Sequence, residues 1–426
     1  MRKLALGLVF LGIAWYVAAP FYYFSIMCHS GMDLGLFTQR IYTFTRGNYM
    51  MVDTLMPKYS QWVDHFSPIM LFLIPIGMLP EWAMPLGLVA VQSYAFIAAS
   101  FFIFKIGVRE GLSATNARLI QGAFLLHPYF MHLSLFDFHP VALAPYFIVA
   151  AVYYVDNKRM FLTFAFGLCL LKETALAMAV GLILYAYLHY KKNYLPWLAM
   201  PVLGGIIFLA LLYFIPHEGP MYYFGNRLGA PLLFPRHLLL MHAWMLLPLG
   251  FMLNFSWALL IAIPEYLLEL FAKNSFSLLI FYQYHTSVVT ALVIALIHCW
   301  RNWYRYFLVV GILAGLIIFS PVSVTFMKDE CLLNRPMKLG ALSYLADIPR
   351  EATVCADNWA IPIVSARHEV HFINNVTYCD YTVMDVDSPW NKERMNKTVH
   401  DEQIADILAR KQPIFNQSGI LVFEGQ

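Results

Sequence analysis

The chain has 426 residues, of which 60% are hydrophobic and only 12% charged, and its mean hydropathy is +0.62. This composition excludes an ordinary soluble protein and predicts a membrane protein with several spans. The net charge of +3 is too small to indicate a nucleic-acid-binding surface. The six cysteines are scattered without a CxxC pair, so we expect neither a zinc site nor a disulfide framework.

The first apolar stretch, Leu4 to Ala19, follows Arg2 and Lys3. It could be a cleaved signal peptide, but the many later apolar runs favour a retained signal anchor. The two basic residues then predict a cytoplasmic N-terminus.

Basic clusters orient the rest of the chain, because lysine and arginine are enriched on the cytoplasmic side of membrane spans. Ten further spans satisfy every cluster, provided that residues 67–80 do not cross. This segment is short and carries three prolines, so we expect it to lie on the surface or to insert only half-way. The expected spans lie near 84–104, 119–134, 141–155, 160–171, 174–190, 195–215, 238–253, 256–271, 284–300 and 306–322.

The sequence therefore predicts a mostly α fold, a polytopic transmembrane bundle of about 11 spans over residues 1–326. Its first external loop is 28–66. From residue 327 to 426 strand-like and helical segments alternate, which indicates a small α/β domain on the external side. Strands are expected at 352–356, 369–373, 381–386 and 420–423, helices at 338–346 and 402–410, and one cysteine pair, Cys355 with Cys379, could form on neighbouring strands.

Asp33 is the first candidate for chemistry. It lies directly after the first apolar run, between Gly31 and Gly35. A carboxylate beside the bilayer is costly unless it has a partner or a task, and the glycines allow a tight turn or the close approach of a ligand. The alternative is a solvated loop aspartate. Asp53, in the same loop, lacks such glycines, so we expect Asp53→Asn to be mild.

The same orientation gathers other unusual polar residues on the outer face, although only lysine and arginine were used to set it. Acids, histidines and cations that converge on one face of a bundle indicate a site. Asp33 would be a general base. The cations and histidines would bind an anionic head group, and Glu173 would orient a sugar or a metal. These expected substrate-binding residues are His65, His139, Lys172, Glu173, Arg227 and His285.

A divalent ion, Mg²⁺ or Mn²⁺, would need a second hard ligand beside Asp33, and Asp137 or Glu173 could supply it. No two of these acids are adjacent, so the sequence leaves metal dependence open. Two further alternatives also stay open. Residues 137–140 could simply start a helix at Pro140, and Lys172 with Glu173 could form an ion pair that holds two helices together.

Several motifs occur together and in order: Asp-Leu-Gly-Leu-Phe-Thr-Gln at 33–39, His-Phe-Ser-Pro at 65–68, Asp-Phe-His-Pro at 137–140, Leu-Lys-Glu-Thr at 171–174 and Gln-Tyr-His at 283–285. In these the chain resembles, over nearly its whole length, a family of uncharacterised prokaryotic membrane proteins grouped with the glycosyltransferase-C (GT-C) superfamily. The resemblance implies an enzyme that uses polyprenyl-phosphate sugars. Asp33 matches the catalytic acid of the first external loop and Asp137 the acid of the second. The chain lacks the tandem acidic pair or Asp-x-Asp of many members.

The functional hypothesis is an inverting glycosyltransferase of the plasma membrane that acts at the external face on a glycan, lipid or protein acceptor. One alternative is a transporter or lipid flippase with a buried polar pathway. Another is a receptor on the same scaffold without catalytic activity. A transporter needs its polar residues near the midplane, whereas the expected topology collects them at one face.

Overall fold

The computed structural model describes residues 1–55, 60–64, 66–215, 235–251, 256–270, 285–323, 329–373, 379–386, 408 and 412–425. It divides into two compact units. Unit 1 comprises Met1–Ala19, Trp62–Leu71 and Val91–Lys328, and unit 2 comprises Pro20–Gln61, Phe72–Ala90 and Asp329–Gln426.

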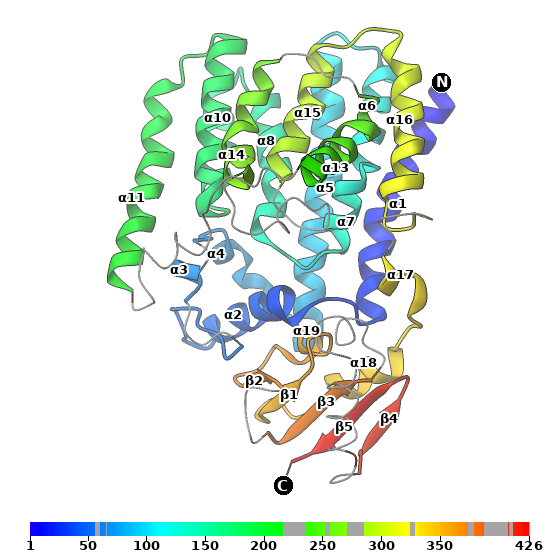
Figure 1. The fold of residues 1–426 in the computed structure, drawn as a ribbon. Coiled ribbons are helices and arrows are strands. Elements are labelled where there is room, and N and C mark those ends of the chain that lie inside the picture. The colour runs from blue at the N-terminus through cyan, green and yellow to red at the C-terminus, as the bar shows by residue number, and fades with distance from the viewer. Residues whose placement is uncertain are drawn as a thin grey trace. The chain divides into compact units, whose positions relative to one another are not determined.

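Unit 1 is a bundle of antiparallel helices (Figure 1). Each of the ten later spans expected from the sequence contains a helix. Two long helices, α1 (Arg2–Ser25) and α5 (Met84–Arg109), belong partly to each unit. The other long helices are α6 (Ala114–Leu125), α7 (Pro128–Leu135), α8 (Ala144–Tyr153), α9 (Lys158–Cys169), α10 (Glu173–Tyr190), α11 (Ala199–Phe214), α13 (Pro235–Leu246), α14 (Ile263–Leu270), α15 (Thr286–His298) and α16 (Tyr304–Phe319).

Three helical stretches among the described residues are long and apolar enough to cross a membrane: Arg2–Ser25, Glu81–Arg109 and Leu195–Phe214. The chain is therefore a mostly helical protein with apolar membrane-type helices, and the total of about 11 spans stays a prediction. Residues 67–80 contain only the short helix α4 (Met70–Leu73) and the 3₁₀ turn η2 (Ile74–Met78). Neither is long enough to cross, as expected from the prolines.

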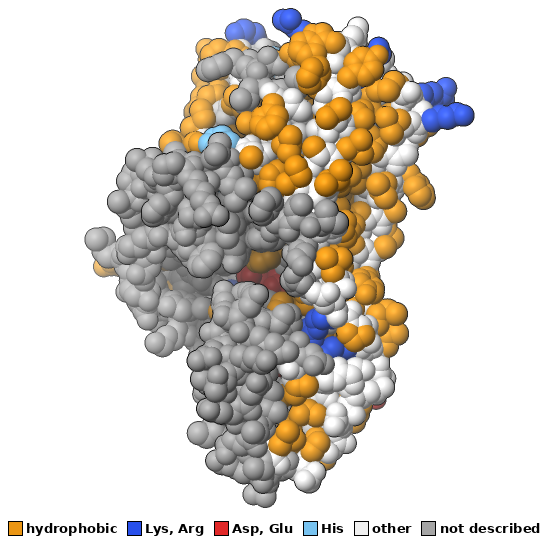
Figure 2. Space-filling model, turned by 45° about the vertical axis from the view of Figure 1, so that its right-hand side comes forward, with side chains coloured by type: hydrophobic (Ala, Val, Ile, Leu, Met, Phe, Trp, Pro, Cys, Tyr) orange, Lys and Arg blue, Asp and Glu red, His pale blue; other side chains and the backbone are white. Residues whose placement is uncertain are grey.

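Aromatic and small residues build the core of unit 1. The rings of Phe124 and Phe130 lie 4.4 Å apart, and the Tyr16 hydroxyl donates to the carbonyl oxygen of Leu125. The exterior is apolar as well: Phe10 of α1 is 76% exposed and Val310 of α16 is 65% exposed. Figure 2 shows hydrophobic side chains over much of the described surface of this face, with lysine and arginine at one end and a further group of them part-way along it. An apolar exterior with basic residues at one end suits a lipid environment.

Unit 2 contains a five-stranded sheet of order β2-β1-β3-β5-β4. The central strands β1 (Val354–Ala356) and β3 (Tyr381–Asp385) pair in parallel, β2 (Val370–Phe372) extends the parallel side, and β5 (Ile420–Glu424) and β4 (Phe415–Gln417) add antiparallel strands. The strands expected from the sequence are thus confirmed, with β4 in addition. The expected helix at 338–346 is α18 (Leu339–Ala346), and the one at 402–410 lies, except for residue 408, outside the described residues.

The loop at 28–66, which the sequence analysis expects to be external, belongs mostly to the same unit as the sheet. It forms the π-helical turn η1 (Gly31–Gly35), which packs with the short helix α19 (Ile361–Val364), and α2 (Leu36–Phe44), which packs with η2. Tyr42, Met84 and Ala366 form a small buried cluster there.

Two disulfides stabilise unit 2. Cys28, after α1, pairs with Cys331 of α17 (Glu330–Asn334), with Cα atoms 6.1 Å apart. Cys355 pairs with Cys379, with Cα atoms 5.8 Å apart. The pairing of Cys355 with Cys379 is confirmed, but the expectation of no disulfide framework is wrong. A separation of 303 residues between Cys28 and Cys331 leaves no spacing signal in the sequence.

Candidate functional site

Asp33 lies in the π-helical turn that opens α2. Ser30 begins the turn: its hydroxyl accepts from the backbone N–H of Met32 and donates to Oδ1 of Asn358. The backbone N–H of Gly31 donates to the carbonyl oxygen of Asn358 at 2.7 Å. Asp33 is half-buried within this anchored turn. Single π turns are frequent at functional sites.

The glycines that flank Asp33 serve close packing inside the chain. A Cβ on Gly31 would lie 2.6 Å from Cβ of Ile361, and one on Gly35 would lie 2.6 Å from its Cγ2. Neither glycine has a positive φ angle. The sequence analysis expected a tight turn or the close approach of a ligand, and what approaches both glycines in the structure is the side chain of Ile361. The turn is held against α19, which fixes the backbone that carries Asp33.

A buried ion pair fixes the part of the 28–66 loop that follows Asp33. Nε of Arg40 lies 2.8 Å from Oδ2 of Asp53, and both side chains are fully buried. Nη1 of Arg40 donates to Oε1 of Gln61 at 2.7 Å. On the other side of α2, Nε2 of Gln39 donates to the hydroxyl of Thr54 at 2.8 Å. The loop is thus folded as part of the unit. The pair with Arg40 predicts that Asp53→Asn lowers stability, and its expected milder effect on sugar transfer than that of Asp33→Asn stays a prediction.

In unit 1, the connection between α7 and α8 carries Asp137 and His139, and both are buried. The side-chain amide of Gln92 in α5 holds this connection: Nε2 donates to the carbonyl oxygens of Leu133 and Phe136, and Oε1 accepts from the backbone N–H of His139. His139 precedes the 3₁₀ turn η4 (Pro140–Leu143), which agrees with the expected helix start at Pro140. No cap is formed by the His139 side chain.

Lys172 and Glu173 stand at the beginning of α10. Lys172 is the extended residue before the helix and is buried at 3% exposure, and Glu173 is half-buried in the first turn. A negative side chain in the first turn of a helix is favoured by the helix dipole. The backbone N–H of Ile69 donates to the carbonyl oxygen of Leu170 at 2.9 Å, so the segment around Ile69 packs on this connection.

His285 stands at the beginning of α15 and is fully buried. Its backbone N–H donates to the hydroxyl of Tyr129 at 3.0 Å, and its ring lies 5.1 Å from the ring of Trp244. Next to it, the carboxylate of Glu265 accepts hydrogen bonds from Thr286, Ser287 and Val288. Glu265 therefore binds the N-terminal amides of α15, as an anion does at a helix start.

These residues lie at the same end of unit 1. In Figure 1 the beginnings of α10 and α15 and the connection between α7 and α8 all lie at one end of the bundle. Asp33 belongs to unit 2 and is not one of the residues at this end of unit 1. Two expected binding residues, His65 and Arg227, lie outside the described residues. The described residues at this end of unit 1 that the sequence singled out are Asp137, His139, Lys172, Glu173 and His285, and Glu265 joins them at the beginning of α15.

A family model matches residues 25–219 and 223–412, which include both units and all of the site residues named above. The family is described as "Predicted membrane protein (DUF2079)". The chain belongs to this family. No curated protein matches the chain.

A second cluster of polar residues in this DUF2079 member lies at the opposite end of unit 1. Glu110, His189 and His298 each offer a ligand atom, and these atoms lie within 4.8 Å of one another. Among the described residues this is the one such group, and neither Asp33 nor Asp137 belongs to it. The sequence analysis missed it, because the three residues are far apart along the chain. The only signal was the repeated placement of histidine at a helix end.

Proposed function

We propose that the chain is an inverting membrane glycosyltransferase that transfers a sugar from a polyprenyl phosphate to an acceptor hydroxyl. The observation that carries the proposal is the placement of Asp33 in a π turn fixed by Gly31, Gly35 and Ile361. A catalytic carboxylate must be held in place by rigid backbone to act efficiently. The motif around Asp33 also matches the first-loop acid in the GT-C resemblance described above.

The disulfides support an external location for unit 2. Disulfides persist in oxidising compartments and are rare in the cytosol. Unit 2 carries both Cys28–Cys331 and Cys355–Cys379. The proposed topology therefore has a cytoplasmic N-terminus in the plasma membrane and an active face outside. Reporter fusions at Lys191 and Gln426 should report opposite sides, and a cytoplasmic Gln426 would contradict the proposal.

The buried ionisable residues of unit 1 would bind the donor. Lys172 and His285 are buried at one end of the bundle, where burial strengthens their attraction to a phosphate group. Arg227 and His65 are proposed to contribute as well, together with His139. Glu173 would orient the sugar. The divalent ion expected from the sequence stays part of this hypothesis.

In the proposed reaction, the carboxylate of Asp33 takes the proton of the acceptor hydroxyl. The hydroxyl oxygen forms the new bond to the anomeric carbon as the bond from that carbon to the phosphate oxygen breaks. Both electrons of the broken bond leave with the polyprenyl phosphate. Attack opposite the leaving group inverts the sugar, and one base together with a good leaving group suits this single displacement.

Replacing Asp33 by asparagine tests the proposal. The change keeps the shape but removes the base, which contributes typically ~100- to 10,000-fold to the rate. We expect transfer from a polyprenyl-phosphate sugar to fall by that factor while the thermal stability in detergent is unchanged. Asp347→Asn, at an exposed position after α18, is the matched control. An Asp33→Asn protein that is destabilised but active would overturn the proposal.

The transporter hypothesis makes a different prediction for the wild-type protein. A flippase moves labelled lipid between leaflets of a reconstituted vesicle without forming a product. Wild-type protein that moves lipid but transfers no sugar from any polyprenyl-phosphate donor would favour that function.

A further inference from the structure

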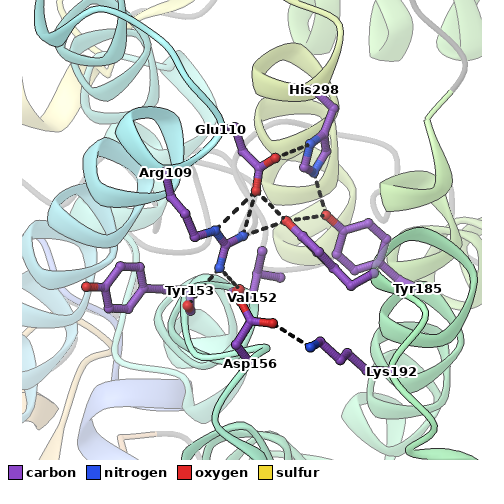
Figure 3. A network of polar contacts seen from close by, with 9 residues as sticks. Arg109, Glu110, Val152, Tyr153, Asp156, Tyr185, Lys192 and His298 are labelled. Carbon is purple, nitrogen blue, oxygen red and sulfur yellow. Dashed lines mark hydrogen bonds and ion pairs between the residues drawn. The ribbon is translucent and has the colours of Figure 1, made fainter.

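Three helices end together at the face of unit 1 that carries the basic residues. Glu110 directly follows α5, and His189 and His298 lie in the last turns of α10 and α15. Figure 3 shows Glu110 and His298 turned toward each other, with Arg109 and Tyr185 beside them. Nothing in the proposed transfer reaction uses these residues.

Their separations suit a shared ion. Oε2 of Glu110 lies 3.8 Å from Nδ1 of His298, too far for a hydrogen bond. A tetrahedral ion bonded to both at about 2.1 Å would hold the two atoms about 3.4 Å apart. His189 packs against His298 with ring centroids 4.2 Å apart, and one of its nitrogens lies within 4.8 Å of both other ligand atoms. Side-chain shifts of less than about 1.5 Å would bring all three into coordination distance.

In two of these side chains, neighbouring residues form hydrogen bonds to the polar atom that does not face the proposed ion. Nε2 of His298 is hydrogen-bonded to the hydroxyl of Tyr185, which directs Nδ1 toward Glu110. Oε1 of Glu110 accepts hydrogen bonds from Arg109 at 2.8 Å and from Tyr190 at 2.9 Å, which leaves Oε2 toward His298. Metal-binding histidines and carboxylates are typically oriented by such hydrogen bonds through their second polar atom.

Arg109 is a cation hydrogen-bonded to Glu110. Arg109 opposes a second cation, but it contacts Oε1 and not the atom that faces His298.

We propose that Glu110, His189 and His298 bind one divalent transition-metal ion that joins the ends of α5, α10 and α15. Two imidazoles and one carboxylate suit zinc, with a fourth position for water. The residues around it include Arg109, Lys191 and Lys192, so the positive-inside rule assigns this end to the cytoplasm. The site is thus separate from the proposed transferase site and does not depend on it.

Direct metal analysis tests the proposal. The full chain, carrying an affinity tag without histidine, is purified in detergent, stripped with a chelator and dialysed against Zn²⁺. We expect one zinc ion per chain by elemental analysis, and a visible absorption band when Co²⁺ replaces zinc. Glu110→Gln, His189→Gln and His298→Gln should each abolish the stoichiometric ion. Tyr185→Phe should weaken binding about 10- to 100-fold, since it removes the hydrogen bond that orients His298.

Two controls lie in the same unit. Asp156 is an exposed carboxylate that pairs with Lys192 close to the cluster (Figure 3), and Asp156→Asn should retain the ion. His242, which is hydrogen-bonded to Tyr266, is outside the cluster, so His242→Gln should also retain it. Thermal unfolding checks that each variant is folded. If a histidine variant fails to fold, the zinc content of Glu110→Gln decides whether the cluster binds the ion. A wild-type chain that binds no zinc, or ion retained by Glu110→Gln, would overturn the proposal.

Discussion

Gly35→Ala tests the packing that places Asp33. An ideal Cβ on Gly35 would lie 2.6 Å from Cγ2 of Ile361, whereas non-bonded carbons rest about 3.5–4.0 Å apart. Relief of this overlap requires α2 or α19 to move, and such overpacking costs about 1–3 kcal/mol. The backbone at Gly35 is helical, with φ −63° and ψ −46°, so alanine regains about 0.5–1 kcal/mol of helix preference. We expect a net loss of about 1–2 kcal/mol.

A double-mutant cycle between Gly35 and Ile361 tests this reasoning. Ile361→Ala alone should cost about 2–5 kcal/mol, because it leaves a cavity. Once Cγ2 of Ile361 is absent, adding Gly35→Ala should be neutral or slightly stabilising. The two changes should therefore couple by about 1–3 kcal/mol, as residues in contact do. Thermal unfolding of the full chain in detergent measures the stability of the wild type, the two single variants and the double variant. Sugar transfer by the same proteins shows whether displacement of the turn also impairs Asp33.

Gly7→Ala is the matched control, because nothing lies within 4 Å of a Cβ there and the residue is also helical. It should be neutral or slightly stabilising. If Gly35→Ala is as harmless as Gly7→Ala, the close approach of Ile361 is not what holds the turn. Additive effects in the cycle would refute the reasoning in the same way.

Three further predictions concern unit 2. Asp53→Asn should lower stability by about 3–5 kcal/mol, measured by thermal unfolding, because it removes the carboxylate that pairs with the buried Arg40; a mild effect on stability would contradict this. Burial and the neighbouring Asp385 raise the pKa of Asp357 to about 7, so its protonated form stabilises the fold below about pH 4 and that contribution is lost as the pH rises through 7. The Tm of the wild type should therefore fall relative to Asp357→Asn between pH 4 and 8, and parallel curves would exclude the effect. Replacing Cys355 and Cys379 together by serine should cost about 3 kcal/mol, the entropy of a loop of this length, and an unchanged Tm in the double variant would show that the bond does not constrain the chain.

The positions of most helices and strands could be predicted from the sequence, because they depend on local patterns. Long apolar runs between basic clusters located α5, α10 and α11, and short alternating runs located β1 and β3. The three-dimensional pairing of these elements is not local. Nothing near Gly31 or Gly35 in the sequence indicates that Ile361 packs on them, so the glycines were as compatible with a ligand as with a helix.

The candidate site was predictable only as a set of positions on one side. The alternation of basic clusters along the chain places Asp137, Lys172 and His285 at the same end of the bundle. Their burial could not be deduced, since isolated polar residues between apolar runs read equally well as exposed loops. Glu265 is the clearest example of what the sequence could not predict. Its carboxylate accepts hydrogen bonds from the N-terminal amides of α15, and this depends on how α14 packs and not on the residues next to Glu265 in the sequence.

The bond between Cys28 and Cys331 has a consequence for biosynthesis. Its two thiols are made far apart in time: at about 5–20 residues per second, roughly 15–60 s pass between them while the 303 residues of separation are added. Cys28 therefore waits as a thiol until the helices of unit 1 have been synthesised. Cys355 and Cys379 follow soon after Cys331, so three competing partners reach Cys28 almost together. A correctly oxidised chain is thus one whose helices have all been threaded, and its faster migration on a non-reducing gel would record the completion of assembly.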